Sequence, residues 1–477
     1  MTPEQPSAEV HLDRSLRFRA AWRWHFYAAW FVLPILVTLA ATGFIILLKP
    51  TIERWAYGDM LYLDSVVTEP LPTAQLIDSV WLTHPDAIID SVVPPRDAGR
   101  ATQIDITDIE GRSLSVYVNP ENADVLGHID NATRIDYVAT QIHGTLWMGR
   151  WGDYLVEMAG GWAVIMALTG TYLWWPRRRR TALRTEFPIE SHGASHTGPS
   201  RRKVPRSVHR RSGMLLAPVL VYLVVTGLPW SGFWGEEIWG TVLERSGAGY
   251  ETPPEPRSNH VALGDQHTAG FPVTWATKRT VIPTSTTDFG AQVALSEPLS
   301  VDEIAAIARD NGMLPGFSIA LPWDEVGVYS VVNAWPSPAQ DERTLHIDQY
   351  SGEVVQELGW NTTYGSLARA TVWGVNSHMG RQLGVVNGFI LGVACVAAIV
   401  SSLSAMAMYW RRRRRRTLGF PRRPVDVRLT RAVIVTAIVL GTVMPLLGLS
   451  ILLVLAIDRW VVREVPPLRT AFGMHDR

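Results

Sequence analysis

Four of the thirteen histidines occupy matched positions in two halves of the 477-residue chain. His25 and His209 each stand nine residues before a proline and seventeen residues before a Thr-Gly pair. His143 and His378 each stand thirty-two residues before a tryptophan that precedes a run of arginines. Histidine in or beside an apolar segment is costly and therefore points to function. Because haem iron takes imidazole as an axial ligand, the chemistry that this set could carry is haem ligation and electron transfer.

Five apolar segments are long enough to cross a bilayer as helices, which takes about 17–25 residues. They are residues 26–48, 155–175, 214–233, 383–410 and 432–457. The first continues into Lys49 and lacks a small-residue cleavage site, so it is not a signal peptide. The single cysteine, Cys395, lies inside an apolar segment, which excludes a disulfide framework and a thiol metal cluster.

The distribution of arginine predicts the topology. Arginine-rich stretches precede the first apolar segment and follow the second and fourth, whereas residues 51–142 and 235–376 are rich in acids. Since Lys and Arg accumulate on the cytoplasmic side, we expect a cytoplasmic N-terminus, an outside C-terminus and two extracytoplasmic segments. The basic runs are short and adjoin the membrane, so no nucleic-acid partner is expected.

This topology places the histidines at two depths. Each pair at one depth suits the two axial positions of a b-type haem. The sequence therefore predicts two haems b. His25 and His209 would hold the cytoplasmic-side iron, and His143 and His378 would hold the periplasmic-side iron.

Helix length constrains the outer pair. Thirty-two residues of helix would extend about 48 Å, more than the bilayer core of about 30 Å. His143 and His378 therefore cannot begin straight spans, and we expect a short interfacial helix to carry each of them. Breaks are available at Gly149, Gly152, Gly380 and Gly384.

Arginines near the histidines are candidates to bind haem propionates, because a guanidinium fork matches a carboxylate. Arg150 and Arg381 lie on the acidic side, which favours this role. For Arg23 and Arg210, propionate binding and a role as cytoplasmic-side anchors fit equally well. Two methionines rank below the histidines as iron ligands: Met148 and Met379.

The two extracytoplasmic segments resemble each other. Each begins with a hydroxyl residue, Thr73 or Ser300, that is typical of a helix N-cap, followed by a short amphipathic helix. Alternating strands follow and end in a hairpin with a turn rich in Asn, Asp or Gly. Three histidines in these segments have no partner at metal-ligand spacing: His84, His128 and His346.

The predicted fold class is an all-α membrane bundle of four core transmembrane helices plus a fifth, with two extracytoplasmic α+β modules and an internal duplication. Each half would run span, module, span. The predicted boundaries are transmembrane helices at 16–50, 141–176 (with an interfacial helix), 207–234, 373–410 (with an interfacial helix) and 432–460, modules at 51–140 and 235–372, and cytoplasmic loops at 177–206 and 411–431.

Several motifs resemble the PepSY-associated transmembrane helix family, and the two modules look like PepSY domains. The motifs are Leu-Thr-Gly-Thr-Tyr-Leu-Trp-Trp-Pro-Arg-Arg at 168–178, Thr-Gly-Leu-Pro-Trp-Ser-Gly at 226–232 and His-Met-Gly-Arg at 378–381. The resemblance covers residues 16–416. It weakens at His143-Gly144, which lacks the His-x-Gly spacing, and at Ser404-Ala405, which stands where other spans have Thr-Gly.

That family includes iron-regulated inner-membrane proteins and ferric-siderophore reductases that hold haem in the membrane. The resemblance implies that the four matched histidines are axial ligands, that the chain lies in the bacterial inner membrane and that a ferric siderophore is its periplasmic partner. No Gly-rich fingerprint for a flavin or nicotinamide follows a strand. The electron donor would therefore be a cytoplasmic protein or the quinol pool.

The leading hypothesis is a haem-b inner-membrane oxidoreductase of the ferric-siderophore reductase type, which passes electrons to an extracytoplasmic acceptor and releases iron(II). One alternative is a non-catalytic, membrane-anchored PepSY protein that binds or regulates an outside partner. Another is a cytochrome-b-like subunit that serves a different periplasmic acceptor. All three are compatible with the sequence.

Overall fold

The computed structural model describes residues 8–175, 203–249, 257–262, 280–285, 297–412 and 431–472. The chain divides into two compact units. Unit 1 consists of Met1–Phe44, Gln141–Ile238 and Leu391–Arg477, and unit 2 consists of Ile45–Thr140 and Trp239–Ile390.

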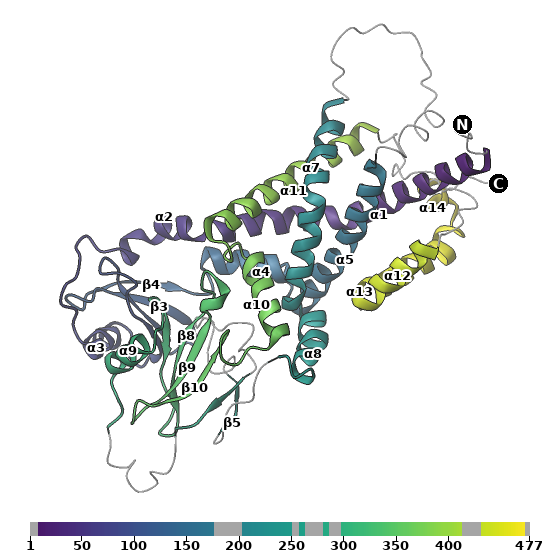
Figure 1. Ribbon diagram of the computed structural model, residues 1–477. Helices are drawn as coiled ribbons and strands as arrows, with labels where there is room; N and C mark the ends of the chain where they lie inside the picture. The colour runs from purple at the N-terminus through teal and green to yellow at the C-terminus, as the bar shows by residue number, and fades with distance from the viewer. Residues whose placement is uncertain are drawn as a thin grey trace, which may run out of the picture. The chain divides into compact units, whose positions relative to one another are not determined.

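Unit 1 is helical (Figure 1). All or most of the following elements belong to it: α1 (Ala8–Leu47), α5 (Gly149–Trp174), α7 (Lys203–Gly227), η1 (Leu228–Trp230), η2 (Gly232–Trp239), α11 (Gly384–Arg412), α12 (Arg431–Val443), α13 (Pro445–Ile457), η5 (Asp458–Val462) and α14 (Pro466–Ala471). Four helical segments among the described residues are long and apolar enough to cross a membrane: Leu16–Leu47, Pro205–Trp230, Gly384–Arg411 and Pro445–Val462.

Helix α5 coincides with the predicted second span but is not one of those four segments. Its N-terminal half carries three charged side chains, which lower its hydropathy. Its glycines allow close helix packing. A Cβ on Gly161 would lie 2.9 Å from Cβ of Leu447 in α13, and a Cβ on Gly160 would lie 3.5 Å from Val224 of α7.

The segment predicted as the fifth span, 432–460, is divided into two helices. The chain breaks at Met444, which has φ −124° and ψ 84°, because Pro445 lacks an N–H and disfavours a helical residue before it. Helices α12 and α13 instead form a hairpin, in which a Cβ on Gly441 would lie 3.2 Å from Cα of Gly448.

The structure places the C-terminal segment beside the N-terminal half of α1, whereas the predicted topology puts the two ends of the chain on opposite sides of the membrane. After the hairpin the chain returns to the beginning of α1, where Nη1 of Arg23 donates a hydrogen bond of 3.0 Å to the carbonyl of Phe472. The ring of Phe472 lies 6.3 Å from that of Tyr27. The C-terminal segment therefore lies at the same end of unit 1 as the start of the first span.

Unit 2 contains an eight-stranded antiparallel sheet in the order β10-β9-β8-β7-β1-β2-β3-β4. Its strands are β1 (Ile88–Val93), β2 (Thr102–Thr107), β3 (Ser113–Val118), β4 (Val125–Asp130), β7 (Ser318–Ala320), β8 (Val328–Asn333), β9 (Arg343–Asp348) and β10 (Val354–Gly359). A separate pair consists of β5 (Arg257–Ala262) and β6 (Val281–Pro283). The two segments predicted as modules thus each contribute four strands to one sheet, joined where Val92 of β1 pairs with Ile319 of β7.

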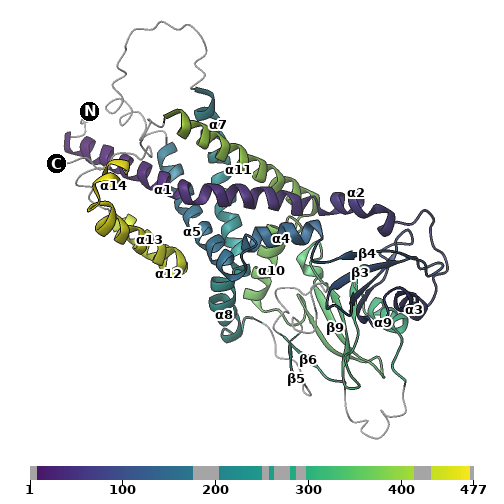
Figure 2. The same ribbon diagram turned by 180° about the vertical axis from the view of Figure 1, so that it is seen from behind.

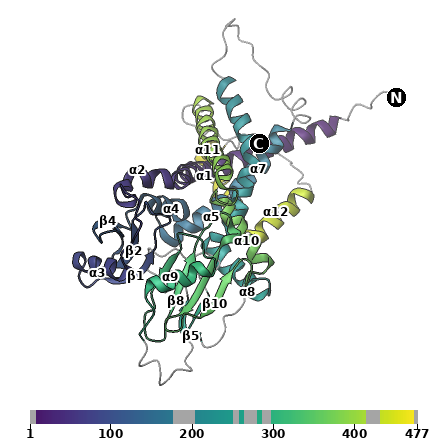
Figure 3. The same cartoon turned by 60° about the vertical axis from the view of Figure 1, so that its left-hand side comes forward.

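The helices of unit 2 are short. They are α2 (Lys49–Leu61), α3 (Thr73–Thr83), α8 (Gly240–Arg245), α9 (Val301–Asp310), η4 (Ala339–Asp341), α10 (Ser366–His378) and the first part of α4 (Ile135–Thr145). Helices α3 and α9 cover one face of the sheet (Figures 2 and 3). Leu76 of α3 and Ile304 of α9 share a single buried core with strand residues of both halves, such as Ile104 and Ile347.

Of the two predicted N-cap residues, Ser300 and Thr73, only Ser300 is an N-cap. Ser300 caps α9 as predicted, in a capping box with Glu303. Thr73 does not cap α3, whose N-cap position is Pro72. The backbone N–H of Thr73 instead donates a hydrogen bond of 2.8 Å to Asp302, the first acid of α9.

Candidate cofactor-binding site

The structure brings His25 and His209 together inside unit 1. His25 lies on α1 and His209 on α7, and their ring centres are 6.4 Å apart with an angle of 66° between the ring planes. The sequence predicted this pair from the matched spacing together with the topology.

Each of these imidazoles is fixed by a backbone carbonyl. Nδ1 of His25 lies 3.0 Å from the carbonyl of Met166 on α5, and Nδ1 of His209 lies 3.1 Å from the carbonyl of Ser401 on α11. A carbonyl only accepts, so Nδ1 carries the proton in both rings. The lone pair is then on Nε2, which is the usual arrangement of a metal-bound histidine.

The Thr-Gly pair at 169–170, part of the motif at 168–178, helps to position His25. Oγ1 of Thr169 lies 3.2 Å from Nδ1 of His25. A Cβ on Gly170 would lie 3.1 Å from Cε1 of the same ring. The hydroxyl of Thr169 therefore helps to orient the His25 ring, and the absence of a side chain on Gly170 leaves room for that ring.

The histidine pair borders a cavity of about 810 Å³ among α1, α5, α7 and α11. This volume lies within the range of about 300–1,000 Å³ that small-molecule and cofactor sites occupy. Most of the lining is apolar or aromatic, including Phe26, Trp30, Leu216, Leu220, Met406 and Trp410. Three arginines also line it: Arg19, Arg206 and Arg210.

Of the arginines that the sequence placed near this pair, only Arg210 lines the cavity. Arg23 is buried against the C-terminal segment, with its guanidinium 5.0 Å from the ring centre of Tyr27. Sequence reasoning missed Arg206. It stands three residues before His209, so one helical turn puts both on one face of α7, and this spacing could have revealed it.

Tyr409 is a second cavity residue that the sequence did not single out. Its ring packs 6.0 Å from Phe26 and 5.5 Å from Trp30, centre to centre. Its hydroxyl is buried and has no hydrogen-bond partner among the described residues. A buried hydroxyl left unsatisfied costs about 1–3 kcal/mol, so a group with an acceptor oxygen in the cavity would stabilise it.

His143 lies on a short helix, as predicted. Helix α4 ends at Thr145, and Leu146, Trp147 and Gly149 have φ of 49°, 59° and 56°, which separates α4 from α5. Gly152 is not a break. It lies within α5, where a Cβ would overlap the carbonyl of Thr145.

A second Thr-Gly pair holds the ring of His143. Nδ1 lies 3.0 Å from Oγ1 of Thr42 on α1, and a Cβ on Gly43 would lie 3.1 Å from Cε1 of the ring. The hydroxyl of Thr42 donates to the carbonyl of Thr38 at 2.8 Å, so it accepts a hydrogen bond from Nδ1. The lone pair of this imidazole is therefore on Nε2, as in His25 and His209.

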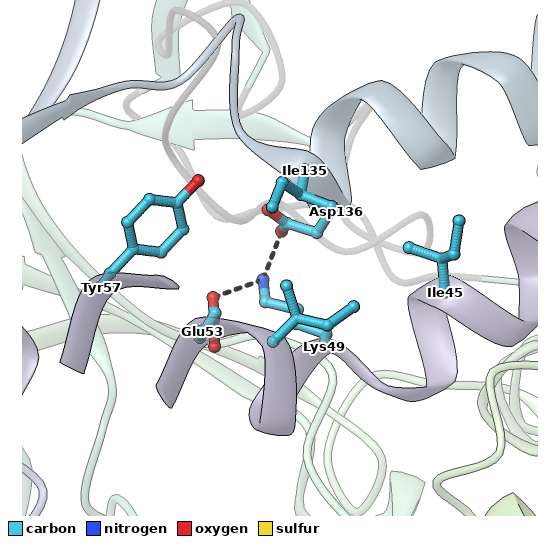
Figure 4. Close-up of a pocket in the computed structure, with 7 residues that line it drawn as sticks. Ile45, Lys49, Glu53, Tyr57, Ile135 and Asp136 are labelled. Atoms are coloured by element: carbon cyan, nitrogen blue, oxygen red, sulfur yellow. Dashed lines mark ion pairs between the residues drawn. The ribbon is translucent and has the colours of Figure 1, made fainter. Parts of the chain in front are cut away.

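A group of charged residues anchors the beginning of α4 (Figure 4). Nζ of Lys49 lies 2.7 Å from Asp136 and 3.5 Å from Glu53. Arg134 lies 2.8 Å from the same carboxylate of Glu53. Lys49, followed by Arg134, lowers the pKa of the Asp136 carboxyl against the effect of burial.

His378 ends helix α10, and Gly380 and Gly384, with φ of 78° and 56°, separate α10 from α11. The predicted short helix and both predicted breaks are therefore confirmed. His378 belongs to unit 2 and His143 to unit 1. Their pairing stays a prediction.

Arg150 and Arg381 have other partners, and neither lines the cavity. Arg150 is 70% exposed and lies 3.4 Å from Glu237. Nη1 of Arg381 donates to the carbonyl of Trp335 at 2.8 Å, and burial, aided by Arg96, lowers the pKa of the Arg381 guanidinium. A propionate-binding role for these two stays a prediction.

The family model described as the PepSY-associated TM region matches residues 22–424. A separate comparison with curated proteins finds no match to the chain. Of the four segments that are long and apolar enough to span a bilayer, the matched region contains two in full and most of a third, Leu16–Leu47. The chain is a membrane protein that belongs to the PepSY-associated TM region family.

Proposed function

We propose that unit 1 binds haem b between His25 and His209, and that the protein is an inner-membrane oxidoreductase that delivers electrons to an extracytoplasmic ferric siderophore. The observation that carries this proposal is the separation of the two imidazoles. Two metal–nitrogen bonds of about 2 Å in line, plus the distance from each nitrogen to its ring centre, give a centre-to-centre separation of about 6 Å. The observed value is 6.4 Å.

The residues around the pair suit the remaining parts of a haem. The carbonyls of Met166 and Ser401 keep Nε2 of each imidazole unprotonated and oriented. The aromatic and aliphatic walls would surround the macrocycle. Arg206 and Arg210 on α7, with the hydroxyl of Tyr409, match the two propionate carboxylates. The bound haem would supply one-electron transfer.

We propose that the chain arose by duplication. Met166 and Ser401, which fix the two histidines, each stand nine residues before the tryptophan that ends its span. The two halves of the sheet each run helix, then four antiparallel strands, and meet at the β1–β7 pair. These features support the assignment of residues 51–140 and 235–372 as PepSY-like modules.

We propose that His143 and His378 hold the iron of the second haem. The support is the repeated motif: Thr42-Gly43 holds His143 in the way that Thr169-Gly170 holds His25. The distribution of arginine supports a cytoplasmic N-terminus and a periplasmic sheet. In that orientation the haems would form an electron path from a cytoplasmic or quinol donor to the periplasmic acceptor.

An absorption spectrum tests the proposal. The purified full-length protein, reduced with dithionite, should show b-type haem bands and contain two haems per chain by pyridine haemochrome assay. His25→Ala and His209→Ala should each lose the same single haem. His196→Ala removes an imidazole from outside the matched set and should keep both. Absence of b-type bands would favour the non-catalytic PepSY alternative.

A second assay separates the two redox alternatives. The dithionite-reduced protein is mixed with a ferric siderophore and a chelator that absorbs when it binds iron(II). Chelated iron(II) should form at the rate at which the haem bands decay, and the His25→Ala variant should be slower. Stable haem bands in the presence of the siderophore would favour a cytochrome subunit with another acceptor.

A further inference from the structure

His84 and His128 lie side by side on unit 2, although the chain separates them by three strands. Their ring centres are 5.0 Å apart, and their planes are nearly perpendicular, at 82°. Neither residue has a partner at metal-ligand spacing in the sequence, and the fold brings the two rings together. Neither histidine belongs to the matched set of four.

Both histidines belong to regular secondary structure. His84 is the C-cap of α3, and its backbone N–H donates to the carbonyl of Val80 at 2.7 Å. His128 lies in β4 directly opposite Val116 of β3. Paired residues of antiparallel strands point to the same face, and Val116 belongs to the core beneath α3. The His128 ring is therefore on the α3 side of the sheet, and it is exposed to solvent.

The geometry points to a divalent-metal site in which His84 and His128 are the two protein ligands and water completes the coordination. With metal–nitrogen bonds of about 2 Å and a tetrahedral angle between them, two imidazoles on one ion have centres about 5 Å apart. This value matches the observed pair and differs from the in-line separation at His25 and His209. Imidazole ligands suit Zn²⁺ and Cu²⁺.

Two charged side chains lie near the histidine pair. Asp108 and Arg112 both act electrostatically on His84, with opposite sign. Asp108 is bound to Arg112 at 2.7 Å. Among the described residues no three His, Cys, Asp or Glu side chains form a metal-binding group, so the site has two protein ligands.

Metal titration of the full-length protein tests this inference. One Cu²⁺ should bind with two coordinated imidazoles, as counted by pulsed EPR, and Zn²⁺ should compete for the same site. His84→Gln and His128→Gln should each leave at most one imidazole on the copper and weaken Zn²⁺ binding measured by calorimetry. His196→Gln should bind both metals like the wild type.

Two outcomes would overturn the inference. One is a double variant, His84→Gln with His128→Gln, that binds Cu²⁺ and Zn²⁺ as the wild type does. The other is a wild-type copper spectrum with a single imidazole. Hydrogen exchange of β4 checks that the variants fold, since both side chains are at the surface. The result is independent of the haem proposal, because neither histidine contributes to the haem spectrum.

Discussion

Gly170 of α5 approaches His25 of α1 so closely that a Cβ on it would lie 3.1 Å from Cε1 of the imidazole. The ring is also held at Nδ1 by the carbonyl of Met166. The imidazole therefore has contacts on two sides from one helix, and its position depends on how closely α5 can approach α1.

Gly170→Val should reduce haem binding. Its side chain needs the space of the imidazole, so the ring must move away from Met166 or the helices must separate. We expect loss of one of the two haems in the pyridine haemochrome assay. Gly160→Val is the matched control, because a Cβ there makes ordinary contact with Val224 at 3.5 Å. Equal haem content in the two variants would contradict the proposed role of Gly170.

Tyr409→Phe should weaken haem binding without changing the axial ligands. The hydroxyl has no partner among the described residues, and a hydrogen bond to a carboxylate contributes about 1.5–3 kcal/mol. We expect faster haem loss to apomyoglobin, a more negative midpoint potential and unchanged positions of the absorption bands.

The control for Tyr409 is Tyr154→Phe, whose ring packs against Phe233 outside the cavity. This variant should keep the wild-type midpoint potential. If Tyr409→Phe binds haem as tightly as the wild type and keeps its potential, the hydroxyl faces no propionate.

Much of the proposed haem site was predictable because length and spacing are physical constraints. Thirty-two residues are too many for one span, which required the short helices that carry His143 and His378. The matched positions of His25 and His209 likewise predicted their meeting. The carbonyl of Met166 was not predictable, because every residue has a carbonyl and only packing selects one.

Other features depend on contacts between distant segments. The proximity of His84 and His128 follows from the packing of α3 beside β4, and sequence spacing does not encode it. The joining of the two modules depends on β1 pairing with β7, which no local pattern predicts. Pro445 is visible in the sequence, but it lies inside the continuous apolar segment 432–457, and the length of that segment predicted one helix.

The C-terminal hairpin predicts that both ends of unit 1 share one side of the membrane. With Cys395→Ala as background, cysteines introduced by Arg19→Cys and by Arg469→Cys should react alike with a membrane-impermeant maleimide on intact cells. Both should be protected if the N-terminus is cytoplasmic. Leu82→Cys, which is 84% exposed on unit 2, should be labelled. Opposite labelling of positions 19 and 469 would show that the chain crosses the membrane between α12 and α14.

The stability of the sheet should depend on His346. This residue is completely buried in β9, and its Nδ1 lies 3.0 Å from Oγ of Ser330. Burial lowers the pKa of His346 from 6.5 to about 3. The unfolded chain therefore binds a proton between these values that the folded chain does not, and stability falls as the pH drops below 6.5.

The predicted loss between pH 7 and pH 5 is about 2 kcal/mol, at 1.36 kcal/mol per unit of pKa difference. Burial raises the pKa of Asp105 in the same sheet, which has the opposite pH dependence, so the comparison must be between variants. Hydrogen exchange of β8 and β9 at pH 7 and pH 5 measures the loss in the full-length protein. His346→Gln keeps a polar side chain beside Ser330 but does not titrate, and it should lack this part of the pH dependence. An equal change in protection for the wild type and His346→Gln would contradict the assignment, because a histidine that stays neutral in the fold must destabilise it in acid.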